Sequence, residues 1–292
     1  MALSFKGRLF LMGLMISIPA ILEATIVALI STRVFEFPIA IGYCLGFCLS
    51  TLSPALIVPS MIQFNLHGYG RKKGIPILTI SASTFDILLV FINFNICHAI
   101  ALSQEEIKVS GRASNPGISV GIVLAEYFGG AAAGLLISVT SLPFRYLTNR
   151  YQLMIKAAYQ CVFGIGIIVT CQLTYSNAWI TAIIFFGYGC SLFWGKNVPT
   201  KEMAAVWFFA QPILFGPSGA GLVIANIKQS DVGYAFLLII CGVTLRVVGI
   251  FLATIGQGFT IKEKFIIVFS NFFIGRFCVN YLFFIFGKKF RP

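Results

Sequence analysis

Nine apolar stretches separated by short polar gaps dominate this sequence of 292 residues. An α-helix needs roughly 20 apolar residues to cross the hydrocarbon core of a bilayer, and the stretches come close to or exceed that length. The gaps leave no room for a second, soluble domain, so we expect one transmembrane domain over residues 1–292. We predict an all-α, multi-pass membrane protein with spans at 9–31, 37–61, 76–103, 118–142, 154–174, 178–195, 203–226, 232–256 and 265–287.

The distribution of charge supports a membrane protein. Charged residues make up 10% of the chain, whereas soluble domains contain about 25%. The formal net charge of +12 would suit a nucleic-acid-binding protein, but most of the basic residues lie in the gaps between spans, as is typical of cytoplasmic loops. We therefore expect no nucleic-acid partner, and we predict a cytoplasmic N-terminus and a cytoplasmic 62–75 loop. The basic residues after the ninth stretch break this alternation, which indicates a miscounted or re-entrant segment, or a chain that lacks a final helix.

Two stretches contain helix-breaking residues at mid-depth. Residues 51–54, which end in Pro54, interrupt the second stretch, and Pro217-Ser218-Gly219 interrupts the seventh. Proline removes a backbone donor, and a membrane tolerates unsatisfied backbone groups only where protein or a water-filled cavity meets them. One interruption in each half of the chain points to an inverted-repeat transporter, in which helix ends bind an ion at the membrane midplane. Two unrelated proline kinks in a channel or a receptor are the alternative.

Asp86 is the one formally charged residue between positions 76 and 103. A carboxylate at this depth costs about 2.5–3.5 kcal/mol on insertion scales, and such acids commonly mark ion or proton pathways. An apolar environment favours the neutral form of a carboxyl group. Asp86 is therefore either a protonated structural group or a carrier of protons or cations. Thr51, Ser53 and the carbonyl groups of the first break would supply neutral oxygen ligands, which hard cations prefer.

Other charged residues also lie inside predicted spans. Glu23 and Arg246 have opposite signs, and a buried pair costs less than two isolated charges, so we predict an ion pair with a structural role. Arg276 is a possible counter-charge for Asp86, although its side chain could instead extend to the membrane surface. The eight cysteines form no CxxC motif, and no P-loop, GxSxG or HExxH motif occurs. We expect no cofactor, no metal other than a transported cation, and no enzymatic chemistry.

At the level of motifs, the chain resembles the cation/proton antiporters, and in detail the NHA branch of animal sodium/proton antiporters. The resemblance runs with few gaps from about residue 8 to about residue 280. It implies a fold with two crossing broken helices, a homodimer, and a chain that lacks the family's first helices and its last one. The segments that carry it include Leu45-Gly46-Phe47, Ser53-Pro54-Ala55, Gly68-Tyr69-Gly70, Ser83-Thr84-Phe85-Asp86, Phe94-Asn95, Gln211-Pro212-Ile213 and Leu245-Arg246.

The resemblance also shows where this chain departs from the family. Asp86 falls on the first of two consecutive aspartates, but Ile87 occupies the position of the second. A core lysine falls on Ile274, and an acidic residue after the second break falls on Gly221. By contrast, Glu23 and Arg246 match a family ion pair that stabilises the core. The membrane scaffold is thus retained while several ion-binding residues are replaced.

Together, these features predict a secondary transporter that exchanges Na⁺ or Li⁺ for H⁺ through Asp86 as a core bundle moves against the rest of the protein. A single carboxylate binds one proton or one sodium ion, so we expect electroneutral exchange. The alternative is a degenerate or truncated paralogue without transport activity, because Ile87 and Ile274 replace charged family residues. A channel or receptor is a third class, which the two interruptions and the mid-depth acid disfavour.

Overall fold

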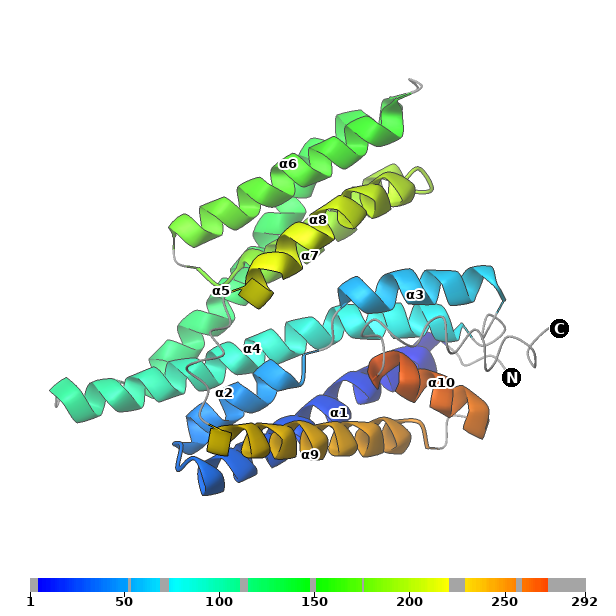
Figure 1. Cartoon of the computed structure of the whole chain (residues 1–292). Helices are drawn as coiled ribbons and strands as arrows, with labels where there is room; N and C mark the ends of the chain where they lie inside the picture. The colour runs from blue at the N-terminus through cyan, green and yellow to red at the C-terminus, as the bar shows by residue number, and fades with distance from the viewer. Residues whose placement is uncertain are drawn as a thin grey trace. The chain divides into compact units, whose positions relative to one another are not determined.

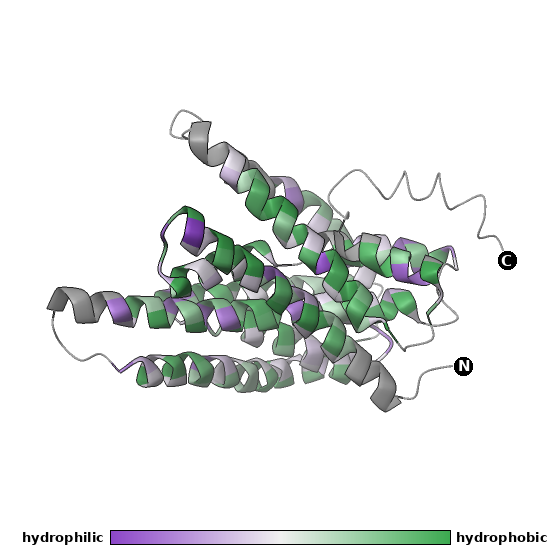
Figure 2. Ribbon diagram, turned by 90° about the horizontal axis from the view of Figure 1, so that it is seen from below, coloured by the Kyte–Doolittle hydropathy of each residue, from purple (hydrophilic) through white to green (hydrophobic). Residues whose placement is uncertain are grey.

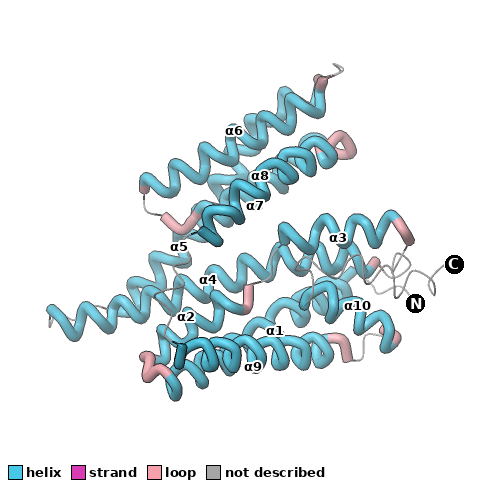
Figure 3. The backbone as a smooth tube through the Cα atoms, in the orientation of Figure 1, coloured by secondary structure: helices cyan, strands magenta, loops and turns pink. Residues whose placement is uncertain are grey.

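The computed structural model describes residues 5–51, 54–68, 74–110, 115–147, 151–174, 176–220, 229–255 and 259–272 (Figure 1). Within these ranges the chain is built from helices and contains no strand (Figure 3), which confirms the predicted all-α class. The helices are α1 (Phe5–Val34), α2 (Ile39–Leu49), α3 (Pro54–Leu66), α4 (Ile75–Ser110), α5 (Pro116–Ser138), η2 (Val139–Tyr146), α6 (Gln152–Leu173), α7 (Trp179–Trp194), α8 (Thr200–Ala220), α9 (Gln229–Ala253) and α10 (Ile261–Phe272).

Several helices have the length and the composition of membrane spans. Within the described residues, five are long and apolar enough to cross a bilayer, and three shorter apolar helices accompany them. Figure 2 shows hydrophobic residues along most of the ribbons. Each predicted span overlaps at least one helix, so the chain is an integral, multi-pass membrane protein. The five long spans are Met12–Val34, Ile75–Gln104, Pro116–Tyr146, Gln152–Leu173 and Gly233–Ala253.

The two predicted interruptions differ in the structure. The first coincides with a helix end, because α2 stops at Leu49 and α3 begins at Pro54. The second is not a break in the described helix, since α8 continues through Pro217, Ser218 and Gly219 to Ala220. A proline removes only one i→i−4 hydrogen bond, and transmembrane helices tolerate that loss where neighbouring groups compensate. The residues after Ala220 lie outside the described part of the chain, and the crossing of two broken helices stays a prediction.

The chain forms two compact units. Unit 1 comprises residues 1–114 and 232–292, and unit 2 comprises residues 115–231. Unit 1 therefore contains α1 to α4, α10 and nearly all of α9, while unit 2 contains α5 to α8 and η2. The prediction of one domain over the whole chain stays a prediction.

Glycines bring α1 and α2 into close contact in unit 1. Gly42 and Gly46 of α2 face Ala28 and Ala24 of α1, and a Cβ added at Gly46 would lie 2.8 Å from the Cα of Ala24. Small residues spaced four apart commonly let membrane helices approach in this way. Because Glu23 precedes Ala24 directly, this contact places an acidic residue of α1 beside the last turn of α2.

Unit 2 repeats this mode of packing between α5 and α7. A Cβ added at Gly130 would lie 2.6 Å from the carbonyl oxygen of Ala178, and one added at Gly134 would overlap the carbonyl group of Ala182. The core of this unit is an apolar cluster that includes Tyr159, a residue of α6. Helix α7 therefore packs against both α5 and α6.

Two polar contacts fix the ends of unit 2. The ammonium group of Lys156, a fully buried residue, donates to the carbonyl oxygen of Asn197 at 3.2 Å. The backbone N–H of Asn177 donates to the carboxylate of Glu126, also at 3.2 Å. The start of α6 and the α7–α8 connection therefore share one end of the unit, and the α6–α7 connection lies at the other end. From the positive-inside bias we predict that the first end, where exposed Lys196 lies, faces the cytoplasm.

This orientation makes a labelling prediction. In a chain whose native cysteines are replaced by serine or alanine, Lys196→Cys is expected to react with a membrane-impermeant maleimide only from the cytoplasmic side. Thr174→Cys, at the exposed end of α6, is expected to react only from the opposite side. Right-side-out and inside-out vesicles provide the two measurements. Labelling of both positions from the same side would contradict the arrangement.

Candidate functional site

Three helices and one helix end bring two acids and one base together inside unit 1. The guanidinium group of Arg246, on α9, donates from Nη1 to Glu23 Oε2 of α1 at 2.6 Å. Its Nη2 lies 3.5 Å from Asp86 Oδ2 of α4. Nη1 also donates to the carbonyl oxygen of Ser50, directly after α2. Only 1% of Asp86, 5% of Glu23 and 6% of Arg246 is exposed, so this is a buried ion cluster.

The carbonyl group of Ser50 is available because of the sequence that follows it. In a continuous helix, the backbone N–H of residue 54 would donate to the carbonyl oxygen of residue 50. Residue 54 is a proline and has no N–H, so this oxygen loses its helical donor. Arg246 supplies the missing donor. The last carbonyl groups of a helix also carry partial negative charge, which favours a cation at this position.

The contacts of Arg246 are unequal in length. The 2.6 Å contact with Glu23 is a short, charge-assisted hydrogen bond. The 3.5 Å contact with Asp86 exceeds the usual 2.7–3.2 Å range for N–H···O bonds and is better described as an ion pair. The base is therefore held mainly by Glu23 and Ser50. Asp86 takes part in the cluster through the weaker of the two acid contacts.

Hydroxyl groups lie close in sequence to two members of the cluster, Ser50 and Asp86. Thr51, which follows Ser50 beyond the end of α2, donates its hydroxyl hydrogen to the carbonyl oxygen of Phe47 at 3.1 Å. Ser83 and Thr84, just before Asp86, both donate to the carbonyl oxygen of Ile80. Each hydroxyl oxygen keeps lone pairs that can accept a hydrogen bond or bind a cation.

The structure distributes the predicted site residues unevenly. Thr51, Asp86, Glu23 and Arg246 lie in unit 1, and Glu23 contacts Arg246 as the sequence suggested. Ile87 is half-buried and follows Asp86 on α4, so its side chain leaves the helix about 100° away. Helix α3 begins at Pro54, and α8 includes the second set of predicted breakers. Four further residues that the sequence singled out lie outside the described residues, namely Ser53, Gly221, Ile274 and Arg276.

Sequence reasoning missed the contact between Asp86 and Arg246. It assigned Arg246 to Glu23 alone and considered Arg276 for Asp86. The two residues in contact are 160 positions apart, and no local pattern links such positions. The relevant signal was the cost of burial, which favours sharing one base between two buried acids. Sequence alone does not say which helices are neighbours, and the sharing therefore emerges only from the structure.

Comparison with known proteins assigns the chain to a family. The model of the sodium/hydrogen exchanger transmembrane region matches residues 5–289. This chain belongs to the sodium/hydrogen exchanger family. It is 32% identical over 259 residues to sodium/hydrogen exchanger 9B2 of Mus musculus and 31% identical over 255 residues to that of Xenopus tropicalis. Sodium/hydrogen exchanger 9B1 of Homo sapiens is 28% identical over 258 residues. The resemblance inferred from sequence motifs is thereby confirmed.

These alignments are unequal in coverage. They include 85% of this chain for the Xenopus protein and 86% for the other two. They include 45% of the two 9B2 proteins and 48% of human 9B1. The chain thus spans less than half the length of the curated relatives that it matches. All members of the ion cluster lie inside the region that matches the exchanger family, between residues 5 and 289.

Proposed function

We propose that this chain exchanges a monovalent cation, Na⁺ or Li⁺, for H⁺, and that Asp86 binds the two in turn. The observation that carries the proposal is the buried cluster, in which Arg246 is held by Glu23 and Ser50 and contacts Asp86 at 3.5 Å. Membership of the sodium/hydrogen exchanger family supports the same class of substrates.

The proposed mechanism is a competition for one carboxylate. When Asp86 is ionised, Arg246 and a monovalent cation compete for its oxygens. When Asp86 is protonated, its attraction to either positive charge falls. Displacing Asp86 from Arg246 breaks the longest contact of the base and leaves the two others in place. Thr51, Ser53 and nearby carbonyl groups are the neutral oxygen donors that we propose for the cation, since oxygen ligands suit hard cations.

The proposed stoichiometry is one cation for one proton. In this mechanism Glu23 stays paired with Arg246, and Ile87 provides no second carboxylate beside Asp86. A single exchanging acid carries one positive charge in each direction, so no net charge moves. This predicts a transport rate that is independent of membrane potential.

The test is a flux measurement on the full chain in liposomes loaded with a pH-sensitive dye. An Na⁺ or Li⁺ gradient is expected to drive proton movement between pH 6 and 9, at the same rate when a potassium diffusion potential is imposed. Asp86→Asn, which keeps the size of the side chain, is expected to abolish the flux. Glu126→Gln, in unit 2 and outside the cluster, serves as the matched acid control and is expected to retain it.

A folded chain without cation-driven flux at any of these pH values would instead support the degenerate, non-transporting alternative. Large ohmic currents would support a channel. By resemblance to the family we also propose a homodimer, and the molecular mass of the same purified preparation measures this directly.

A further inference from the structure

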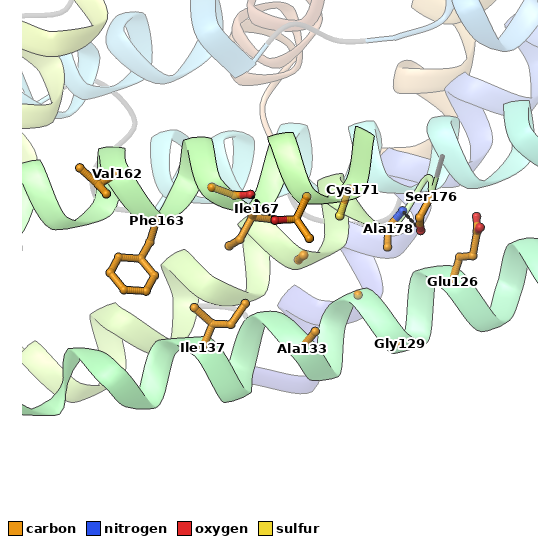
Figure 4. A pocket seen from close by; sticks show the side chains of 14 residues that line it. Glu126, Gly129, Ala133, Ile137, Val162, Phe163, Ile167, Cys171, Ser176 and Ala178 are labelled. Atoms are coloured by element: carbon orange, nitrogen blue, oxygen red, sulfur yellow. Dashed lines mark hydrogen bonds between the residues drawn. The ribbon is translucent and has the colours of Figure 1, made fainter. Parts of the chain in front are cut away.

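An apolar cleft of about 630 Å³ lies within unit 2 (Figure 4). Residues of α5 and α6 form its two walls, and Ala178 and Ala182 contribute to its floor. Small residues create the space, because Gly129, Ala133 and Gly166 line the cleft without filling it. Its volume falls within the range of roughly 300–1,000 Å³ that is typical of sites for small molecules.

The two ends of the cleft differ in chemistry. Figure 4 shows Glu126 and Ser176 at one end, and Ile137 and Phe163 toward the other. Glu126 and Ile137 are separated by eleven residues of α5, which corresponds to about 16 Å along the helix. The cleft is therefore elongated, with an acidic end and a hydrocarbon-lined end.

Asn177 holds the carboxylate of Glu126 at this end through one of its two oxygens. Its Oε2 accepts hydrogen bonds from the backbone N–H of Asn177 at 3.2 Å and from the side-chain amide of the same residue at 3.3 Å. Its Oε1 receives no hydrogen bond from the described residues. The carboxylate is partly exposed, so Oε1 can accept a hydrogen bond from a bound molecule.

We propose that this cleft binds a membrane-resident long-chain amine, with its ammonium group at Glu126 and its hydrocarbon chain directed toward Ile137. The walls belong to candidate membrane spans and the lining is mostly apolar, so the occupant that we propose is a largely apolar molecule from the bilayer. A carboxylate at the cleft end favours a positive head group. None of the described residues that line the cleft is a lysine or an arginine, and a phospholipid would therefore bring its phosphate toward an acid without a compensating base.

Charge recognition can be tested by photolabelling the full chain in liposomes. The probe is a long-chain primary amine with a diazirine on its chain, and the control is an alcohol with the same chain. Mass spectrometry is expected to locate amine cross-links on the cleft residues of α5 and α6. Glu126→Gln keeps an oxygen acceptor for Asn177 but removes the negative charge. It is expected to lower amine labelling about tenfold and to leave alcohol labelling unchanged.

Occlusion of the cleft provides a second, independent test with a matched control. A Cβ added at either Gly166 or Gly164 of α6 would meet no atom within 4 Å, so neither substitution forces a clash at Cβ. Only Gly166 lines the cleft. Gly166→Leu is therefore expected to abolish labelling by both probes, while Gly164→Leu retains it.

Three outcomes would overturn the proposal. The first is equal labelling by amine and alcohol that Glu126→Gln does not change. The second is cleft labelling that persists in Gly166→Leu. The third outcome concerns Cys171, which lines the cleft. In it, a short bifunctional thiol reagent links two copies of the chain through this cysteine, and the cleft of the linked chains takes up no label. That result would assign the cleft to a second copy of the chain. None of these readouts depends on transport, so they stand apart from the test of Asp86.

Discussion

Replacing Arg246 with glutamine is expected to destabilise the chain by about 3–5 kcal/mol, the cost of leaving buried ions uncompensated. The guanidinium group contacts two buried carboxylates and the carbonyl oxygen that Pro54 leaves without a helical donor. Glutamine lacks the charge and cannot reach all three acceptors. In a thermal unfolding measurement on purified protein, the midpoint is expected to fall by on the order of 10 °C.

Two further variants separate the cluster from a general effect of losing a base. Arg33→Gln removes an exposed arginine at the end of α1 and is expected to change stability by less than about 0.5 kcal/mol. In the double variant Glu23→Gln with Arg246→Gln, one of the two stranded acids is neutralised. Its loss of stability is therefore expected to be smaller than the sum of the two single losses. Additive losses would argue against direct coupling between Glu23 and Arg246.

The second large effect is expected at the α1–α2 contact. Gly46→Ala adds a Cβ that would lie 2.8 Å from the Cα of Ala24, so the backbones must separate. Overpacking of this kind costs about 1–3 kcal/mol. The movement would also shift Glu23, the residue before Ala24, away from the end of α2. We therefore expect a lower unfolding temperature together with slower cation-driven proton flux in the liposome assay.

Gly13→Ala is the matched control on α1. A Cβ added at Gly13 meets no atom within 4 Å, and alanine favours a helix over glycine by about 0.5–1 kcal/mol. The two substitutions have the same chemistry but are expected to change the unfolding temperature in opposite directions. Destabilisation by both, or by neither, would show that the close approach at Gly46 does not control the packing of these helices.

The spans and the first break could be predicted from sequence because their causes are local. A run of about 20 apolar residues indicates a span whatever surrounds it. Pro54 has no backbone N–H, so the carbonyl oxygen of residue 50 lacks its helical donor in any surroundings. The Glu23–Arg246 contact follows from a more general argument, since two isolated charges of opposite sign are costly in a membrane.

Other features depended on neighbours that sequence does not reveal. Pro217 resembles Pro54 in its local chemistry, yet α8 continues through it while α2 ends before Pro54. The sharing of Arg246 with Asp86 depends on the arrangement of α1, α4 and α9. The cleft in unit 2 requires α5 and α6 to lie on either side of α7. In sequence, nothing distinguishes Gly129, which lines the cleft and has open space around it, from Gly134, which packs tightly against α7.

The carbonyl group at Ser50 also bears on the order in which this protein is made. Its donor, Arg246, follows it by 196 residues, and the same arginine follows Asp86 by 160 residues. At roughly 5–20 residues per second, ribosomes reach Arg246 on the order of ten seconds after Asp86. The first helices therefore enter the membrane with two acids and an open carbonyl group whose base does not yet exist. Completion of this cluster is necessarily a late step of biogenesis, after α9 has been synthesised.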